Sequence, residues 1–138
     1  MNATDTLFYS VKTDKSVEDA VKAVSDALSH HQFGVLWALD INQKLVEKGL
    51  EAEPPFHILE VCSAPRAKEA LAANQKVGYF LPCKIVVYRD RDTDTTVVGF
   101  PKPDVLIGLL KEPRLEGLAR EVSEVLAKAV DEAVGLTS

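Results

Sequence analysis

The strongest constraint on the fold is a long amphipathic helix near the end of the chain. Apolar side chains recur every three or four residues from Arg114 to about Val134. They form one stripe: Leu115, Leu118, Val122, Val125, Leu126, Ala129, Val130 and Ala133. Glu116 precedes Arg120, and Glu124 precedes Lys128, by four residues, the favourable order for ion pairs on a helix. The sequence therefore predicts a stable C-terminal helix that is buried along this stripe.

Short β-rich runs precede the helix, and we expect them to form strands. They cover residues 6–12, 34–40, 56–62, 83–90 and 95–100. The last two flank a short Asp/Thr turn, which predicts a hairpin. In the second run, strict alternation would put Val35, Trp37 and Leu39 on one face.

Capping residues mark the shorter helices. Ser16 is expected to cap an amphipathic helix, with Asp19 at its third position, that ends near His30, His31 and Gly34. Three further helical segments are expected: residues 41–49 capped by Asp40, an alanine-rich helix that starts at Ser63 and Pro65, and one or two turns capped by Asp104.

Length and charge restrict the class of protein. The 138 residues suit one domain, 1–138, with its own core. A net charge of −5 without a basic cluster argues against nucleic-acid binding. The first residues lack a basic, then apolar, secretory pattern, and the longest apolar run, Val105 to Leu110, is too short to span a bilayer. We therefore expect a cytoplasmic protein, without membrane contact, whose two cysteines are reduced.

The central part of the chain carries a family resemblance. The segments "ILEVCSAPRAKEAL" and, above all, "GYFLPCKIVVY", followed by "TTVVGFPKPD", lie between Phe33 and Asp104. In these segments the chain resembles the family catalogued as domain of unknown function 302. The resemblance implies an α+β fold of the TATA-binding-protein-like group: a curved, mostly antiparallel sheet of about five strands backed by helices. It implies no activity and no DNA binding.

Cys62 and Cys83 are the first candidates for chemistry. If their strands are antiparallel neighbours, the end of one lies beside the start of the other, and the thiols share a sheet edge. Cys62 directly precedes a helix, whose N-terminal dipole is expected to lower a thiol pKa, whereas an apolar strand face is expected to raise that of Cys83. Two readings stay open: small buried apolar residues, or a redox or nucleophilic role for Cys62 with or without Cys83.

Metal sites are not favoured by the spacing of possible ligands. His57 and Cys62 should point to opposite sides of their strand, and His30 and His31 are expected to interact with the end of the first helix. Three aspartates, Asp90, Asp92 and Asp94, have calcium-loop spacing, but the loop glycine is absent and Pro101 takes the place of the last ligand. A solvated hairpin turn is the favoured interpretation.

Glu60 and the Val105–Leu110 segment are the remaining unusual features. By alternation Glu60 shares the face of Phe56, Ile58 and Cys62. Either this face is covered and the carboxyl is desolvated, or the strand lies at an edge of the sheet with the carboxylate in water, which we favour. The leucines of the segment, Leu106, Leu109 and Leu110, either cover an edge of the sheet or form a dimer contact or a lid.

No nucleophile elbow, catalytic triad order or glycine-rich phosphate loop occurs, so the sequence favours a protein that is not an enzyme and needs no cofactor or metal. We expect a homodimeric domain that binds a small apolar ligand in a cleft near Trp37, Cys62 and Cys83. The alternatives are a thiol-dependent protein that uses Cys62, with Glu60 and Cys83 as weaker catalytic candidates, and a structural subunit of a larger assembly.

Overall fold

The structure, a computed structural model, describes residues 6–136. One antiparallel sheet of five strands runs through it in the order β1-β5-β4-β3-β2. Its strands are β1 (Phe8–Thr13), β2 (Gly34–Asp40), β3 (Phe56–Cys62), β4 (Cys83–Arg89) and β5 (Thr96–Pro101). The helices are α2 (Val17–Ser29), α3 (Ile41–Glu47), α4 (Ala64–Ala73), α5 (Pro103–Gly108), α6 (Pro113–Ala133) and the 3₁₀ helix η1 (Gln75–Phe80). The predicted α+β class with an antiparallel sheet and a long last helix is confirmed.

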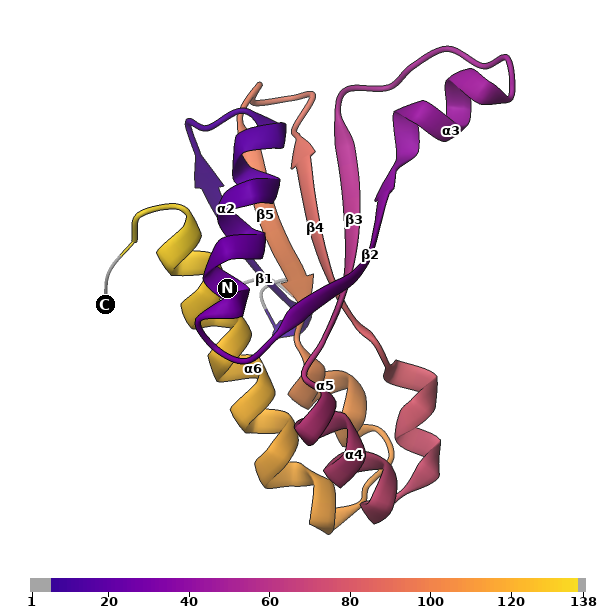
Figure 1. Cartoon of the computed structure of the whole chain (residues 1–138), viewed down its shortest axis with the longest axis vertical. Coiled ribbons are helices and arrows are strands. Elements are labelled where there is room, and N and C mark those ends of the chain that lie inside the picture. Colours follow the sequence, from indigo (N-terminus) through magenta and orange to yellow (C-terminus); the bar gives the residue numbers. More distant parts are fainter. Residues whose placement is uncertain (1–5, 137–138) are drawn as a thin grey trace.

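Two helices cover one face of the sheet. Figure 1 shows α2 and α6 side by side on this face, and the two helices contact each other. The main core fills the space between them and the sheet; among its fully buried side chains are Leu28, Leu59, Ile85, Leu126 and Val130. The later part of the predicted α6 stripe, from Val122 to Ala133, therefore packs in this core between the helices and the sheet. None of the helices within residues 6–136 forms a layer over the middle of the other face of the sheet.

A second, smaller core lies at the helix-rich end of the sheet. It joins α4, η1, α5 and the first half of α6, which gather at the lower end in Figure 1. Its buried residues are Ala70, Val77, Ile107, Leu115 and Ala119, with Phe80, Leu81, Leu110 and Leu118 packed against them. The side chains of the apolar Val105–Leu110 segment therefore have different surroundings. Ile107 and Leu110 pack in this core, whereas Leu109 is 70% exposed to solvent.

The helix α3 lies at the opposite end of the sheet. It has no buried residue and extends away from the other helices in Figure 1. Asp40 caps it as predicted, because the Asp40 carboxylate accepts a hydrogen bond from the Gln43 backbone N–H. Val46 in α3 and Leu50 just after it are each 59% exposed.

Helix boundaries agree with the capping signals in part. The Ser16 hydroxyl accepts from the Asp19 N–H at the start of α2, as predicted. The predicted Asp104 cap is wrong: Lys102 is the cap residue of α5, and Pro103 and Asp104 are in its first turn. The proline ring favours the first helical position, where no N–H is needed, so it moves the start of the helix back by two residues.

Candidate functional site

A bulge in β2 sets the geometry of the site. The register of β2 against β3 shifts between Val35 and Trp37, so that two β2 residues occupy the place of one. Val35 packs against the main core beneath the helices, whereas Leu36 and Trp37 both line a cleft on the uncovered side. The predicted common face for Val35, Trp37 and Leu39 is therefore wrong, because an extra residue interrupts the alternation.

The cleft beside this bulge has a volume of about 530 Å³. Its walls come from β2, the middle of β3, η1, the start of β4 and the region where β5 enters α5. Most of its lining is apolar: Leu36, Trp37, Phe80, Leu81, Pro82, Cys83, Pro101, Pro103, Leu106 and Ile107. The volume and the apolar lining are typical of a pocket for a small molecule.

Two charged side chains lie in this cleft, Glu60 and Lys84. They are directly opposite each other on β3 and β4, and Glu60 is also opposite Trp37 on β2. Opposed residues on one face have Cβ atoms about 5 Å apart, so the three side chains form a row across three strands. Neither Glu60 nor Lys84 forms a hydrogen bond or an ion pair with another of the described residues.

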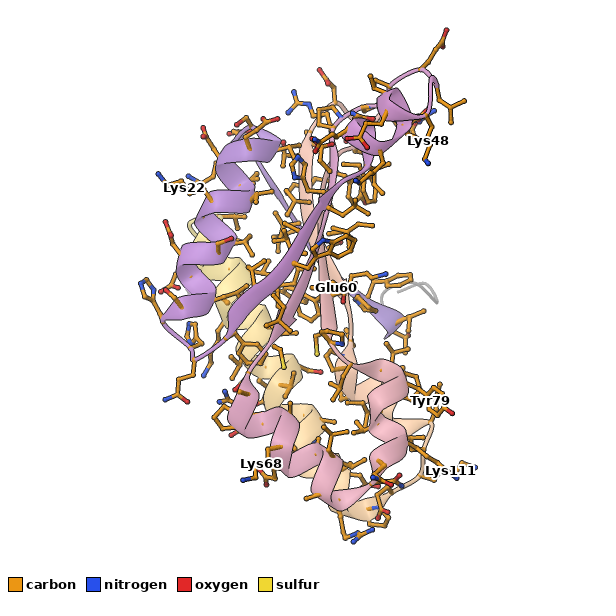
Figure 2. All side chains as sticks on the ribbon, turned by 45° about the vertical axis from the view of Figure 1, so that its right-hand side comes forward. Lys22, Lys48, Glu60, Lys68, Tyr79 and Lys111 are labelled. Carbon is orange, nitrogen blue, oxygen red and sulfur yellow. The ribbon has the colours of Figure 1, made fainter. Side chains whose placement is uncertain are left out.

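The lower wall of the cleft is formed by η1 and the turn after it. The sequence did not predict this 3₁₀ helix, which the Asn74 side chain caps by accepting from the Lys76 N–H. The Leu81–Pro82 peptide bond that follows is cis. Tyr79 is 87% exposed at the rim, and Figure 2 shows it below Glu60 on this segment.

The two cysteines meet at a separate, smaller cavity. Because β3 and β4 are antiparallel neighbours, with Val61 opposite Cys83, the two thiols come to the same end of the sheet, as the antiparallel prediction required. Both line a small cavity of about 30 Å³, enough for a water molecule, together with Phe33 and Arg66. Cys83 also lines the large cleft, whereas Cys62 does not. Both thiols are free.

Burial determines the acidity of both thiols. It raises the pKa of Cys62, so the predicted lowering by the α4 N-terminus is wrong. The pKa of Cys83 is raised to about 11, first by burial and then by the neighbouring Cys62 and Glu60. At neutral pH both side chains are therefore mainly neutral thiols, which are poor nucleophiles.

Glu60 is not on an edge strand. Since β3 lies between β2 and β4, the predicted edge position is wrong. The side chain is only partly buried because it lies on the face that the described helices leave uncovered. The sequence pattern did not reveal this uncovered face. Solvent reaches the carboxylate there, as it would on an edge strand.

The remaining candidates belong to local structure. Asp90 accepts hydrogen bonds from the N–H groups of Asp92 and Thr93, and Asp94 pairs with Arg89, so these carboxylates organise the predicted hairpin turn. The side chains of His30 and His31 approach Glu132 in α6, at 3.2 and 3.8 Å, so they connect α2 to the last helix. Within residues 6–136, no group of three or more His, Cys, Asp or Glu side chains is placed to hold a metal ion. In the same residues, no helix is long and apolar enough to cross a membrane.

Several residues of the cleft were not predicted from the sequence. Leu36, Tyr79 and Lys84 are the clearest cases. Leu36 depends on the bulge and Lys84 on the β3–β4 register, and both are set by contacts distant in sequence. The local signal for Tyr79 is the aromatic pair shortly before a proline in "GYFLP", a segment that also carries the family resemblance.

Comparison with known proteins identifies the family. The family described as "Domain of unknown function DUF302" matches residues 9–133. The chain belongs to this family. The crystal structure of an uncharacterized conserved DUF302 protein from Bacillus stearothermophilus is similar, with a TM-score of 0.86 and 38% sequence identity over 92% of this chain and 98% of that chain. The search of curated proteins found no match. The resemblance seen in the sequence is thus confirmed, and the DUF302 match extends beyond residues 33–104 on both sides.

Proposed function

We propose that this DUF302 protein is a small-ligand-binding domain, and that its ligand occupies the cleft beside Trp37. The observation that carries the proposal is the β2 bulge, which turns both Leu36 and Trp37 into a largely apolar cleft of about 530 Å³. Leu36 and Trp37 are 63% and 53% exposed, so an apolar ligand would remove unfavourable surface from water. Bulges are common where a strand must re-aim a side chain next to a functional site.

The chain provides its own reporter for this site, because Trp37 is its only tryptophan. We expect the neutral apolar dye Nile red to bind, with a rise in dye emission and a saturable loss of Trp37 emission. Leu36→Ser should weaken the dye's affinity because it removes an apolar wall of the cleft. The matched control is Leu109→Ser, since Leu109 is similarly exposed at 70% but does not line the cleft.

Equal loss of affinity in the two leucine variants would contradict the cleft as the binding site. Native mass spectrometry of the protein as purified is the complementary measurement. A co-purifying small molecule that is absent from Leu36→Ser supports the proposal, and absence of both ligand and dye binding refutes it.

We also propose that the protein acts as a homodimer in the cytoplasm, without nucleic-acid partners. Two apolar side chains in and just after α3, both exposed and outside the cleft, support an intermolecular contact: Val46 and Leu50. The β2 strand is an edge of the sheet, and it presents apolar residues instead of the charges that usually protect an edge. Light scattering after gel filtration should give a dimer, and Val46→Asp with Leu50→Asp should give a monomer; a monomeric parent protein would refute this part.

A thiol-dependent function is the second candidate. It is favoured by one observation, that Cys62 and Cys83 line the same small cavity. Burial, which raises the pKa of both thiols, weighs against a reactive thiolate. The test is alkylation with iodoacetamide near neutral pH, read by mass spectrometry: labelling of Cys62 much faster than of Cys83 supports a reactive thiol, and equally slow labelling of both excludes it.

A further inference from the structure

The charges of the cleft restrict its ligand more than its volume does. Glu60 and Lys84 are opposed on adjacent strands, yet they form no ion pair with each other or with other described residues. Both side chains line the same cleft, among apolar residues. Glu60 is half-buried and Lys84 is exposed, so a carboxylate that accepts hydrogen bonds and an ammonium that donates them both face whatever enters the cleft.

From this arrangement we infer that the ligand is a free α-amino acid with a large apolar side chain. The inference rests on the proposed ligand-binding function of this cleft. The ligand ammonium would pair with the Glu60 carboxylate, and the ligand carboxylate with the Lys84 ammonium. The charge-assisted hydrogen bonds that result are the strongest that the cleft can offer.

Ligands with one charge or none fit less well. An anion would be attracted by Lys84 but repelled by Glu60. A cation would be attracted by Glu60 but repelled by Lys84. A neutral apolar molecule would cover both charges without pairing with either, which costs free energy. A zwitterion whose ammonium and carboxylate are attached to the same carbon can pair with Glu60 and Lys84 at once.

The neighbours of the charged pair suit the rest of an amino acid. Trp37 is opposite Glu60, so the ligand ammonium would also lie near an indole ring, whose face attracts cations. The apolar side chain of the ligand would then point to the opposite wall, where Leu81 from the end of η1 and Leu106 from α5 line the cleft.

The test uses the complete chain and four probes that share a phenylethyl group and differ in the charged groups attached to it: L-phenylalanine, 2-phenylethylamine, 3-phenylpropionate and 2-phenylethanol. Calorimetry should give the lowest Kd for phenylalanine, with each single-charge probe about tenfold weaker, because one charge-assisted contact is lost. Phenylalanine should also displace Nile red. Tighter or equal binding of any of the other three probes overturns the inference.

Variants assign the two contacts. Glu60→Gln should weaken phenylalanine about tenfold and leave 3-phenylpropionate unchanged or tighter, and Lys84→Met should weaken phenylalanine while 2-phenylethylamine is unchanged or tighter. The matched controls are Lys68→Met and Glu69→Gln, at two exposed positions of α4 outside the cleft. They should leave the affinity for all probes unchanged. Equal effects of cleft and control variants contradict the assignment.

The two proposals fail in different ways. If Nile red binds and responds to Leu36→Ser, but phenylalanine neither binds nor displaces it, the amino-acid inference is refuted while the ligand-binding function stands. If neither the dye nor phenylalanine binds, both are refuted.

Discussion

The Tyr9 hydroxyl donates a hydrogen bond of 2.5 Å to the Asp131 carboxylate, which connects β1 to α6. The two residues are 122 positions apart. Tyr9 also packs on Phe100 of the neighbouring strand, with ring centroids 5.4 Å apart. Because β1 is an edge strand with one neighbour, β5, this contact supplies a second attachment to the body of the fold.

Replacing the hydroxyl should cost stability. We expect Tyr9→Phe to lower the free energy of unfolding by about 1 kcal/mol, the usual value of a partly buried hydrogen bond. Tyr88→Phe is the matched control, since Tyr88 is also half-buried but its hydroxyl has no hydrogen bond with the described residues. Urea unfolding followed by circular dichroism measures both; an equal loss in the two variants would contradict a specific role for the Tyr9–Asp131 contact.

The same contact predicts a loss of stability at high pH. Burial and the Asp131 carboxylate raise the pKa of Tyr9 to about 12, above its value of about 10 in an unfolded chain. A raised pKa means that the folded state favours the protonated phenol, so this contribution is complete below pH 10 and disappears between pH 10 and 12. Unfolding free energies measured across this window should fall more steeply for the parent protein than for Tyr9→Phe. Parallel curves would rule out the contribution of Tyr9.

A second tertiary contact, around Arg66, should be as important nearer the opposite edge of the sheet, beside β3 and β2. The Arg66 guanidinium donates to the His31 carbonyl, the Ser63 hydroxyl and the Glu121 carboxylate. It also lies over the Phe33 ring, 5.4 Å from the centroid. Arg66 therefore joins α4 to the turn before β2 and to α6.

We expect Arg66→Ala to lower the free energy of unfolding by about 1–3 kcal/mol, because charged hydrogen bonds and the packing of the side chain are lost together. Thermal unfolding measures the effect. Arg114→Ala is the control, since the Arg114 guanidinium pairs with Glu112, only two residues away, and the change should leave the melting temperature nearly unchanged. Similar shifts in both variants would show that the contacts of Arg66 stabilise no more than a surface pair.

Local sequence signals predicted most of the elements and fewer of the contacts. The Ser16 and Asp40 caps, the α6 stripe and the hairpin around the Asp90 turn were predictable because each depends on residues close in sequence. The Tyr9–Asp131 and Arg66–Glu121 contacts were not, since they depend on how distant elements pack. Nor could the sequence show that the helices of the described part of the chain leave one face of the sheet uncovered.

The candidate site was predicted in part for the same reason. Trp37 and Cys83 were expected near a cleft and both line it, but Cys62 lines a neighbouring cavity. The difference comes from strand geometry: the β2 bulge turns Trp37 to the open face. The place of Cys62 before α4 predicts a reactive thiol, whereas burial raises the pKa of this thiol.

The close approach of β1 to β5 gives the last prediction, at Gly99. A Cβ atom at this position would lie 2.9 Å from the Tyr9 carbonyl oxygen and 3.0 Å from the Ser10 Cβ, so the backbone of β1 would have to move. We expect Gly99→Ala to destabilise the fold by about 1–3 kcal/mol, the usual cost of overpacking. Gly108→Ala is the control, because its added Cβ meets nothing within 4 Å and alanine favours a helix. Urea midpoints should fall for Gly99→Ala and stay level or rise for Gly108→Ala; hydrogen exchange should show the loss first in β1. An unchanged midpoint for Gly99→Ala would mean that β1 and β5 tolerate a wider separation than the structure has.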